Sequence, residues 1–81
     1  MKYIATFFSH FGAMRFEKNC RKQNIPARLM PVPRLLSSSC GTCVSYECDE
    51  YSLSGNISEE VEQIVEVQTD GYKECYRAEN S

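Results

Sequence analysis

The fold is decided by the stretch Asn56-Ile57-Ser58-Glu59-Glu60-Val61-Glu62-Gln63-Ile64-Val65. Its apolar residues recur at the spacing of one helix face, and two glutamates fall in the first turn, where the helix dipole favours negative charge. Asn56 or Ser58 is a suitable N-cap, and Asp70-Gly71 would end the helix. We therefore expect a second helix that begins near residue 57 and ends at the Asp-Gly pair.

Outward from this helix, the remaining segments give strand signals and one further helix signal. Ser9 is a suitable N-cap for a first helix, which ends near Asn24 because Pro26 cannot continue it. Pro31 indicates that the segment around it lies at a sheet edge. Apolar runs and alternating polarity predict four strands, at residues 3–8, 27–32, 42–48 and 72–77.

This order of elements predicts the ferredoxin-like βαββαβ arrangement, an α+β fold with two helices packed on a four-stranded antiparallel sheet. The expected spatial order of the strands is 4-1-3-2. The first strand would then end, and the first helix and the third strand would begin, at the same edge of the sheet. The side chains expected to converge there are Ser9, His10, Arg34, Ser37, Ser38, Ser39, Cys40 and Cys43. Cys20 and Cys48 should not reach Cys40.

Length and composition indicate one small domain, residues 1–81. A hydrophobic content of 42% is sufficient for a globular fold with a small core. No apolar run approaches the roughly 18 residues of a membrane span, and the N-terminal apolar run lacks the cleavage site of a signal peptide. The five cysteines form no regular disulfide framework. We therefore expect a cytoplasmic protein with free thiols.

Charge is divided unevenly along the chain, although the formal net charge is only −2. Residues 1–39 hold seven cations against one carboxylate, whereas residues 40–81 hold two cations against ten carboxylates. The first half could supply a basic face for a partner, or only the solvated outer face of a basic helix. The overall acidity argues against a nucleic-acid binder. The last strand, as a sheet edge, could pair with a second copy to form a homodimer.

The residues best suited to chemistry surround Cys40. This cysteine follows an arginine and three serines and precedes Gly41, which lets backbone amides approach a ligand closely. Nearby cations and exposed N–H groups favour a thiolate, so Cys40 is the expected reactive thiol. The residues expected to stabilise an anionic form of its sulfur are His10, Arg34, Ser38, Ser39 and Gly41.

Cys43 leaves other interpretations open. A C-x-x-C disulfide with Cys40 is geometrically possible, so Cys43 could be a second catalytic, resolving thiol or a plain strand residue. Together with Cys48 the two thiols give C-x-x-C-x₄-C, which makes a zinc or iron–sulfur site the rival hypothesis. Strand alternation puts Cys43 and Cys48 on opposite faces, so we expect neither a metal nor another cofactor. A non-catalytic interaction domain is a third hypothesis.

Several segments match a known family. They are Phe8-Ser9-His10, Ala13-Met14 with Glu17, Ile25-Pro26, and above all Pro31-Val32-Pro33-Arg34 with the serines and Cys40-Gly41. On these residues the chain resembles the small bacterial family of Se/S carrier protein-like domains over nearly its whole length. The resemblance implies an accessory carrier of sulfur or selenium more than a stand-alone enzyme, with donor and acceptor proteins as partners. Cys40 matches the family cysteine, whereas Cys43 stands where the family usually has an apolar residue.

Overall fold

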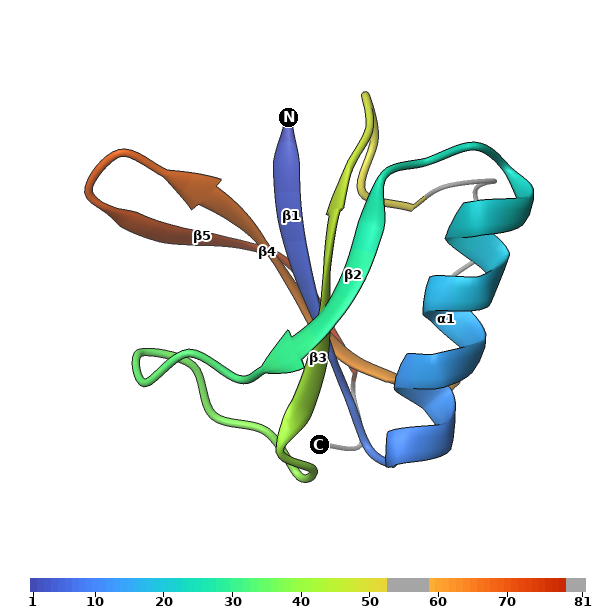
Figure 1. The fold of residues 1–81 in the computed structure, drawn as a ribbon. Helices are drawn as coiled ribbons and strands as arrows, with labels where there is room; N and C mark the ends of the chain where they lie inside the picture. Colours follow the sequence, from blue (N-terminus) through green and yellow to red (C-terminus); the bar gives the residue numbers. More distant parts are fainter. Residues whose placement is uncertain (53–58, 79–81) are drawn as a thin grey trace.

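The computed structural model describes residues 1–52 and 59–78, which form one helix and a five-stranded antiparallel sheet (Figure 1). The elements are β1 (Lys2–Phe7), α1 (His10–Lys22), β2 (Ala27–Pro31), β3 (Thr42–Glu47), β4 (Val61–Gln68) and β5 (Gly71–Arg77). Their order across the sheet is β2-β3-β1-β4-β5, and α1 packs on one face of it. Within this part of the chain, no helix is long and apolar enough to cross a membrane.

The expected ferredoxin-like fold is wrong, because the segment expected as a second helix contains a strand, β4. β4 pairs with β1 where the last strand was expected, so the order 4-1-3-2 is also wrong, and β5 lies outside β4. The pairing of β3 with β1 and with β2 agrees with the prediction, and β2 is an edge strand. Three positions of the expected helix start, Asn56, Ile57 and Ser58, lie outside the described residues.

A β-bulge explains why β4 has the apolar spacing of a helix. A regular strand points successive residues to opposite faces, so Val61 and Ile64 would lie on different faces. The register between β1 and β4 shifts between Thr6 and Phe7, which pair with Gln63 and Val61, so that β4 accommodates one extra residue. Val61 and Ile64 are consequently both buried in the cluster that faces α1. The bulged strand thereby imitates the i, i+3 pattern of an amphipathic helix.

The β4–β5 hairpin turns at Thr69-Asp70, between the paired residues Gln68 and Gly71. An Asp-Gly pair between β-branched segments is a hairpin signal, but it is equally compatible with a helix stop. Gly71 has a φ of 151°, a conformation that residues with side chains rarely adopt. Glycine is therefore suited to the start of β5, because it adopts this positive φ without the strain that a side chain would cause.

Aromatic rings fill the space between α1 and the sheet. We call this cluster the helix-side core; its buried members are Tyr3, Ala5, Phe7, Ala13, Cys20, Val44, Tyr46, Val61 and Ile64. The ring of Phe16 from α1 lies 5.2 Å from that of Phe7 and 5.1 Å from that of Tyr46, measured between centroids. Ala13, Phe16 and Cys20 all face this cluster, which confirms the buried face predicted for the first helix.

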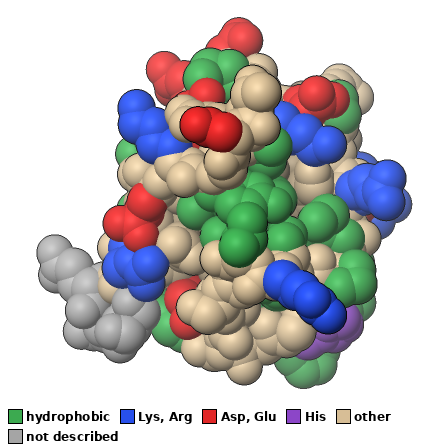
Figure 2. Space-filling model, turned by 90° about the vertical axis from the view of Figure 1, so that its left-hand side faces the viewer, with side chains coloured by type: hydrophobic (Ala, Val, Ile, Leu, Met, Phe, Trp, Pro, Cys, Tyr) green, Lys and Arg blue, Asp and Glu red, His purple; other side chains and the backbone are tan. Residues whose placement is uncertain are grey.

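The opposite face of the sheet carries a smaller apolar cluster, which we call the open-face cluster. Its buried members are Ile4, Cys43 and Val65, and its half-buried members are Met30, Val32, Leu36, Val67 and Tyr72. Figure 2 shows apolar side chains gathered at the centre of this side of the molecule, away from α1. Because both faces of the central strands are buried, β1 and β3 contribute side chains to two clusters at once.

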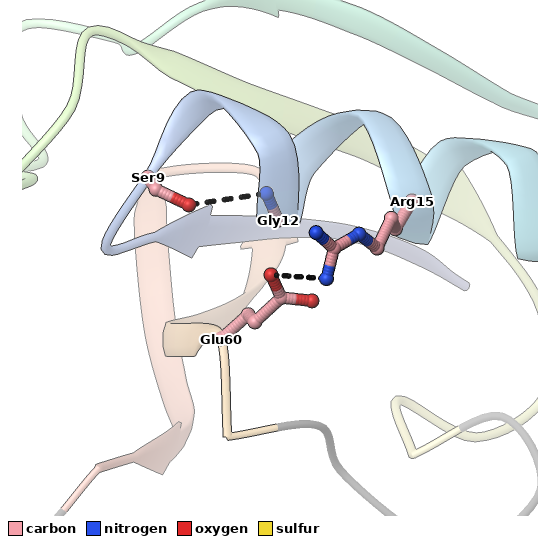
Figure 3. Close-up of polar contacts among 4 residues, drawn as sticks. All are labelled: Ser9, Gly12, Arg15 and Glu60. Atoms are coloured by element: carbon pink, nitrogen blue, oxygen red, sulfur yellow. Dashed lines mark hydrogen bonds and ion pairs between the residues drawn. The ribbon is translucent and has the colours of Figure 1, made fainter.

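The first turn of α1 lies against the residues that precede β4 (Figure 3). The Ser9 hydroxyl accepts a hydrogen bond from the Gly12 N–H at 3.2 Å and caps the helix, as predicted. The Arg15 Nη1 lies 3.0 Å from Glu60 Oε2 and forms an ion pair. A Cβ on Gly12 would lie only 2.8 Å from the Glu60 Cβ. Glycine at this position therefore permits the close approach of α1 to the residues that precede β4.

We predict that Gly12→Ala lowers the free energy of unfolding by on the order of 1 kcal/mol. Overpacking costs about 1–3 kcal/mol, whereas the higher helix propensity of alanine offsets about 1 kcal/mol at most. Urea unfolding measures the change. Gly41→Ala is the matched control, because a Cβ there meets no atom within 4 Å. A Gly12→Ala protein as stable as the wild type would contradict the close approach.

Candidate functional site

The segment that we call the Cys40 loop, residues 32–41, connects β2 to β3 at the edge where β1 ends and α1 begins. The Val32 N–H donates to the Gly41 carbonyl at 3.3 Å and closes the loop at its base. The ring of His10, the first residue of α1, lies with Nδ1 3.1 Å from Thr42 Oγ1 at the start of β3. His10 therefore lies beside the start of β3, as predicted, although the fold around it differs. Cys43 does not join this group as predicted, because it packs in the open-face cluster.

Ser38 ties the Cys40 loop to the end of β1. Its hydroxyl donates to the Phe7 carbonyl at 3.2 Å and accepts from the Cys40 N–H at 3.3 Å. Cys40 is half-buried against the helix-side core, and its thiol donates to the Thr42 carbonyl with Sγ and oxygen 3.3 Å apart. The Cys40 backbone and side chain are thus each held by a neighbouring residue of the same edge.

Glu62, at the start of β4, binds Ser39. The Ser39 N–H donates to Glu62 Oε1 at 3.0 Å, and the Ser39 hydroxyl donates to Oε2 at 2.8 Å. Hydrogen bonds to a carboxylate are stronger than those between neutral groups. Two donors expected to face a bound anion therefore bind an internal carboxylate instead. Sequence reasoning missed Glu62, because within an expected helix nothing placed it beside this loop.

The two side chains expected to stabilise an anion from outside the serine run, those of Arg34 and His10, are both accessible. Arg34 is exposed on the Cys40 loop and forms no ion pair with any residue in the described ranges. His10 is also exposed and contacts Thr42, the residue whose carbonyl accepts from the Cys40 thiol. Gly41 is exposed with open space around it, so packing does not demand a glycine there. Both Arg34 and His10 are thus open to solvent.

Cys43 lies on the opposite side of the sheet from Cys40. It is fully buried in the open-face cluster, and its thiol lies 3.6 Å from the Pro31 carbonyl, to which it donates. Burial raises the pKa of the Cys43 thiol to about 11, and the neighbouring Cys40 sulfur adds to the shift. Since the thiolate is the nucleophile, a buried thiol with a raised pKa is inert at neutral pH. This geometry favours a packing role for Cys43 over a resolving one.

The other three thiols lie against the helix-side core. Burial raises the pKa of Cys20, in the second half of α1, to about 11. Desolvation also raises the pKa values of Cys48 and Cys75. The Cys48 N–H donates to the Met1 carbonyl, at the far end of β1 from Cys40. The expected separation of Cys48 from the Cys40 edge is therefore observed.

The structure gives no support to the zinc or iron–sulfur hypothesis. Within residues 1–52 and 59–78, no group of three His, Cys, Asp or Glu side chains is placed to hold a metal ion. The C-x-x-C-x₄-C spacing does not become a ligand set, because Cys40 and Cys43 pack on opposite faces of the sheet.

Comparison with known proteins connects the chain to a family. The family described as "Putative Se/S carrier protein-like" matches residues 2–77, which is nearly the whole chain. No curated protein and no solved structure matches the chain. The matched range includes the Cys40 loop and all five strands.

We predict that Glu62→Ala loosens the Cys40 loop, because it removes the acceptor of both Ser39 hydrogen bonds. Hydrogen exchange of the Ser39 amide should accelerate by roughly tenfold, the equivalent of about 1.4 kcal/mol. NMR-detected exchange measures this rate. Glu59→Ala, which removes an exposed carboxylate just before β4, is the control and should leave it unchanged. An unaltered rate in Glu62→Ala would show that the carboxylate does not hold the loop.

Proposed function

The chain belongs to this Se/S carrier protein-like family, and we propose that it carries sulfur or selenium covalently on Cys40. The observation that carries the proposal is the setting of this thiol. Cys40 is half-buried on a loop fastened to β1 and β4, and the exposed Arg34 lies on the same loop. A carrier needs an accessible nucleophile and a docking surface and does not need a deep substrate pocket. A domain of 81 residues can provide both.

Loading is proposed to follow thiol–disulfide exchange chemistry. The Cys40 thiolate attacks the terminal sulfur of a donor protein's persulfide, a new S–S bond forms, and the bond within the donor persulfide breaks. The electron pair of that bond leaves on the donor thiolate, so the step needs no added oxidant or reductant. Delivery repeats the exchange with an acceptor thiol. Selenium would be carried as –S–Se⁻ in the same position.

The anionic product is proposed to be stabilised from the solvent side of the edge. Arg34 can supply positive charge, His10 can supply a ring N–H donor, and the backbone amide of Gly41 lies next to the thiol in the chain. The Ser38 hydroxyl already bonds the Cys40 N–H and would orient the loaded sulfur indirectly. The Ser39 donors would join only after their bonds to Glu62 break.

Cys40 alone is proposed to carry the sulfur or selenium atom, in a compartment that keeps thiols reduced. Cys43 is not assigned a resolving role, because its thiol is buried on the opposite face and its pKa is raised to about 11. All five cysteines are free, which suits the cytoplasm, where thiols stay reduced. The partners are the donor and acceptor proteins that exchange the sulfur or selenium atom.

We predict that incubation of the reduced protein with a cysteine desulfurase and cysteine adds the mass of one sulfur atom to Cys40. Intact and peptide mass spectrometry detect the addition, which should be absent in Cys40→Ser. Cys75→Ser, which removes another half-buried thiol, is the matched control and should load normally. Equal loading of Cys40→Ser would refute the assignment. So would an unloaded wild type under conditions that load an established acceptor.

A further inference from the structure

A groove of about 310 Å³ runs between the outer side of α1 and the edge strand β2. Its apolar lining consists of Phe11, Met14 and Leu29, which are 68%, 46% and 40% exposed. Adjacent exposed apolar side chains with a polar rim are typical of interaction surfaces. None of these three side chains belongs to the helix-side core or to the open-face cluster. We call this surface the α1–β2 groove.

The rim of the α1–β2 groove is basic. Its charged lining residues are Arg15, Glu17, Lys18 and Arg21, three cations and one carboxylate. Arg21 pairs with Glu17 at 2.7 Å and Arg15 pairs with Glu60 at 3.0 Å, but both arginine side chains stay largely exposed, and exposed pairs of this kind contribute little free energy. Lys18 makes no ion pair with any described residue. The rim therefore has positive charge available for the carboxylates of a partner.

One end of the α1–β2 groove adjoins the edge that holds Cys40. Phe11 directly follows His10, and the His10 ring contacts the Thr42 hydroxyl. The Cys40 thiol donates to the carbonyl of the same Thr42. A protein bound along α1 would thus extend to the residue that contacts the thiol.

We propose that the α1–β2 groove docks an acidic segment with apolar anchors, belonging to the protein that loads or unloads Cys40. The acidic chemistry follows from the groove itself, whereas the identification of its owner as a donor or acceptor rests on the proposed carrier function. A second copy bound symmetrically would bring two basic rims together, and like charges across an interface are repulsive. A nucleic acid would suit the rim but not the apolar lining or the net charge of −2.

The test is a ¹⁵N NMR titration of the full chain with a synthetic amphipathic helical peptide that has leucines on one face and glutamates on the other. Amide shifts should map to α1 and β2 around Phe11, Lys18 and Leu29. Phe11→Ser and Lys18→Glu should each weaken binding by about tenfold or more. Lys73→Glu, on β5 at the other edge of the sheet, is the charge-matched control and should bind like the wild type.

Two further peptides separate the contributions of charge and apolar anchors. Replacing the glutamates by lysines, or the leucines by alanines, should reduce affinity by about tenfold or more. Absence of shifts in the α1–β2 groove overturns the proposal. Equal binding of the lysine peptide or of a single-stranded oligonucleotide also overturns it, as does a dimer in sedimentation that Phe11→Ser abolishes.

Combined with the peptide titration, the sulfur-loading assay distinguishes a failure of the docking site from a failure of the carrier function. Peptide binding in the groove without sulfur loading would contradict the carrier function and leave the acidic docking site standing. Sulfur loading without peptide binding would overturn the docking site alone. If both hold, excess acidic peptide should slow loading of the wild type from the desulfurase, and a rate unaffected by the peptide would refute the groove as the donor's docking site.

Discussion

The structure depends on β1, which pairs with β3 and β4 along its two edges and is buried on both of its faces. Alternate residues of β1 enter the helix-side core and the open-face cluster, so one strand joins the two halves of the hydrophobic interior. The end of β1 also anchors the Cys40 loop, because the Phe7 carbonyl accepts the Ser38 hydrogen bond. The same strand therefore organises the core and holds the loop that carries Cys40.

The sequence predicts the first half of the fold well, because local signals there agree with the tertiary arrangement. Ser9 caps α1, and Pro31 lies on an edge strand as its missing N–H requires. β4 could not be assigned in this way, since its bulge places Val61 and Ile64 on one face at helical spacing. The hydrogen bonds of Glu62 depend on that strand, so they were also beyond prediction. The contact of His10 with the start of β3 was predictable because it needs only α1 and β3, which were assigned correctly.

The five thiols lie in different surroundings. Four of them have raised pKa values because the surrounding protein desolvates the thiolate, and Cys43 is in addition sealed on the opposite face of the sheet. Cys40 differs from them by its place on a loop tied to β1 and β4. The two sides of α1 have different surroundings. Its inner side packs in the helix-side core, and its outer side lines the α1–β2 groove. The Cys40 loop and one end of the α1–β2 groove thus adjoin the same edge of the sheet.

Site-resolved alkylation of the folded protein most directly tests the claim that Cys40 is its reactive thiol. With limiting iodoacetamide at neutral pH, peptide masses should show Cys40 modified first and Cys48 and Cys75 later. Cys20 and Cys43 should stay protected, since alkylation requires the thiolate and burial raises both of their pKa values to about 11. Modification of Cys43 or Cys75 ahead of Cys40 in the folded chain would contradict this account.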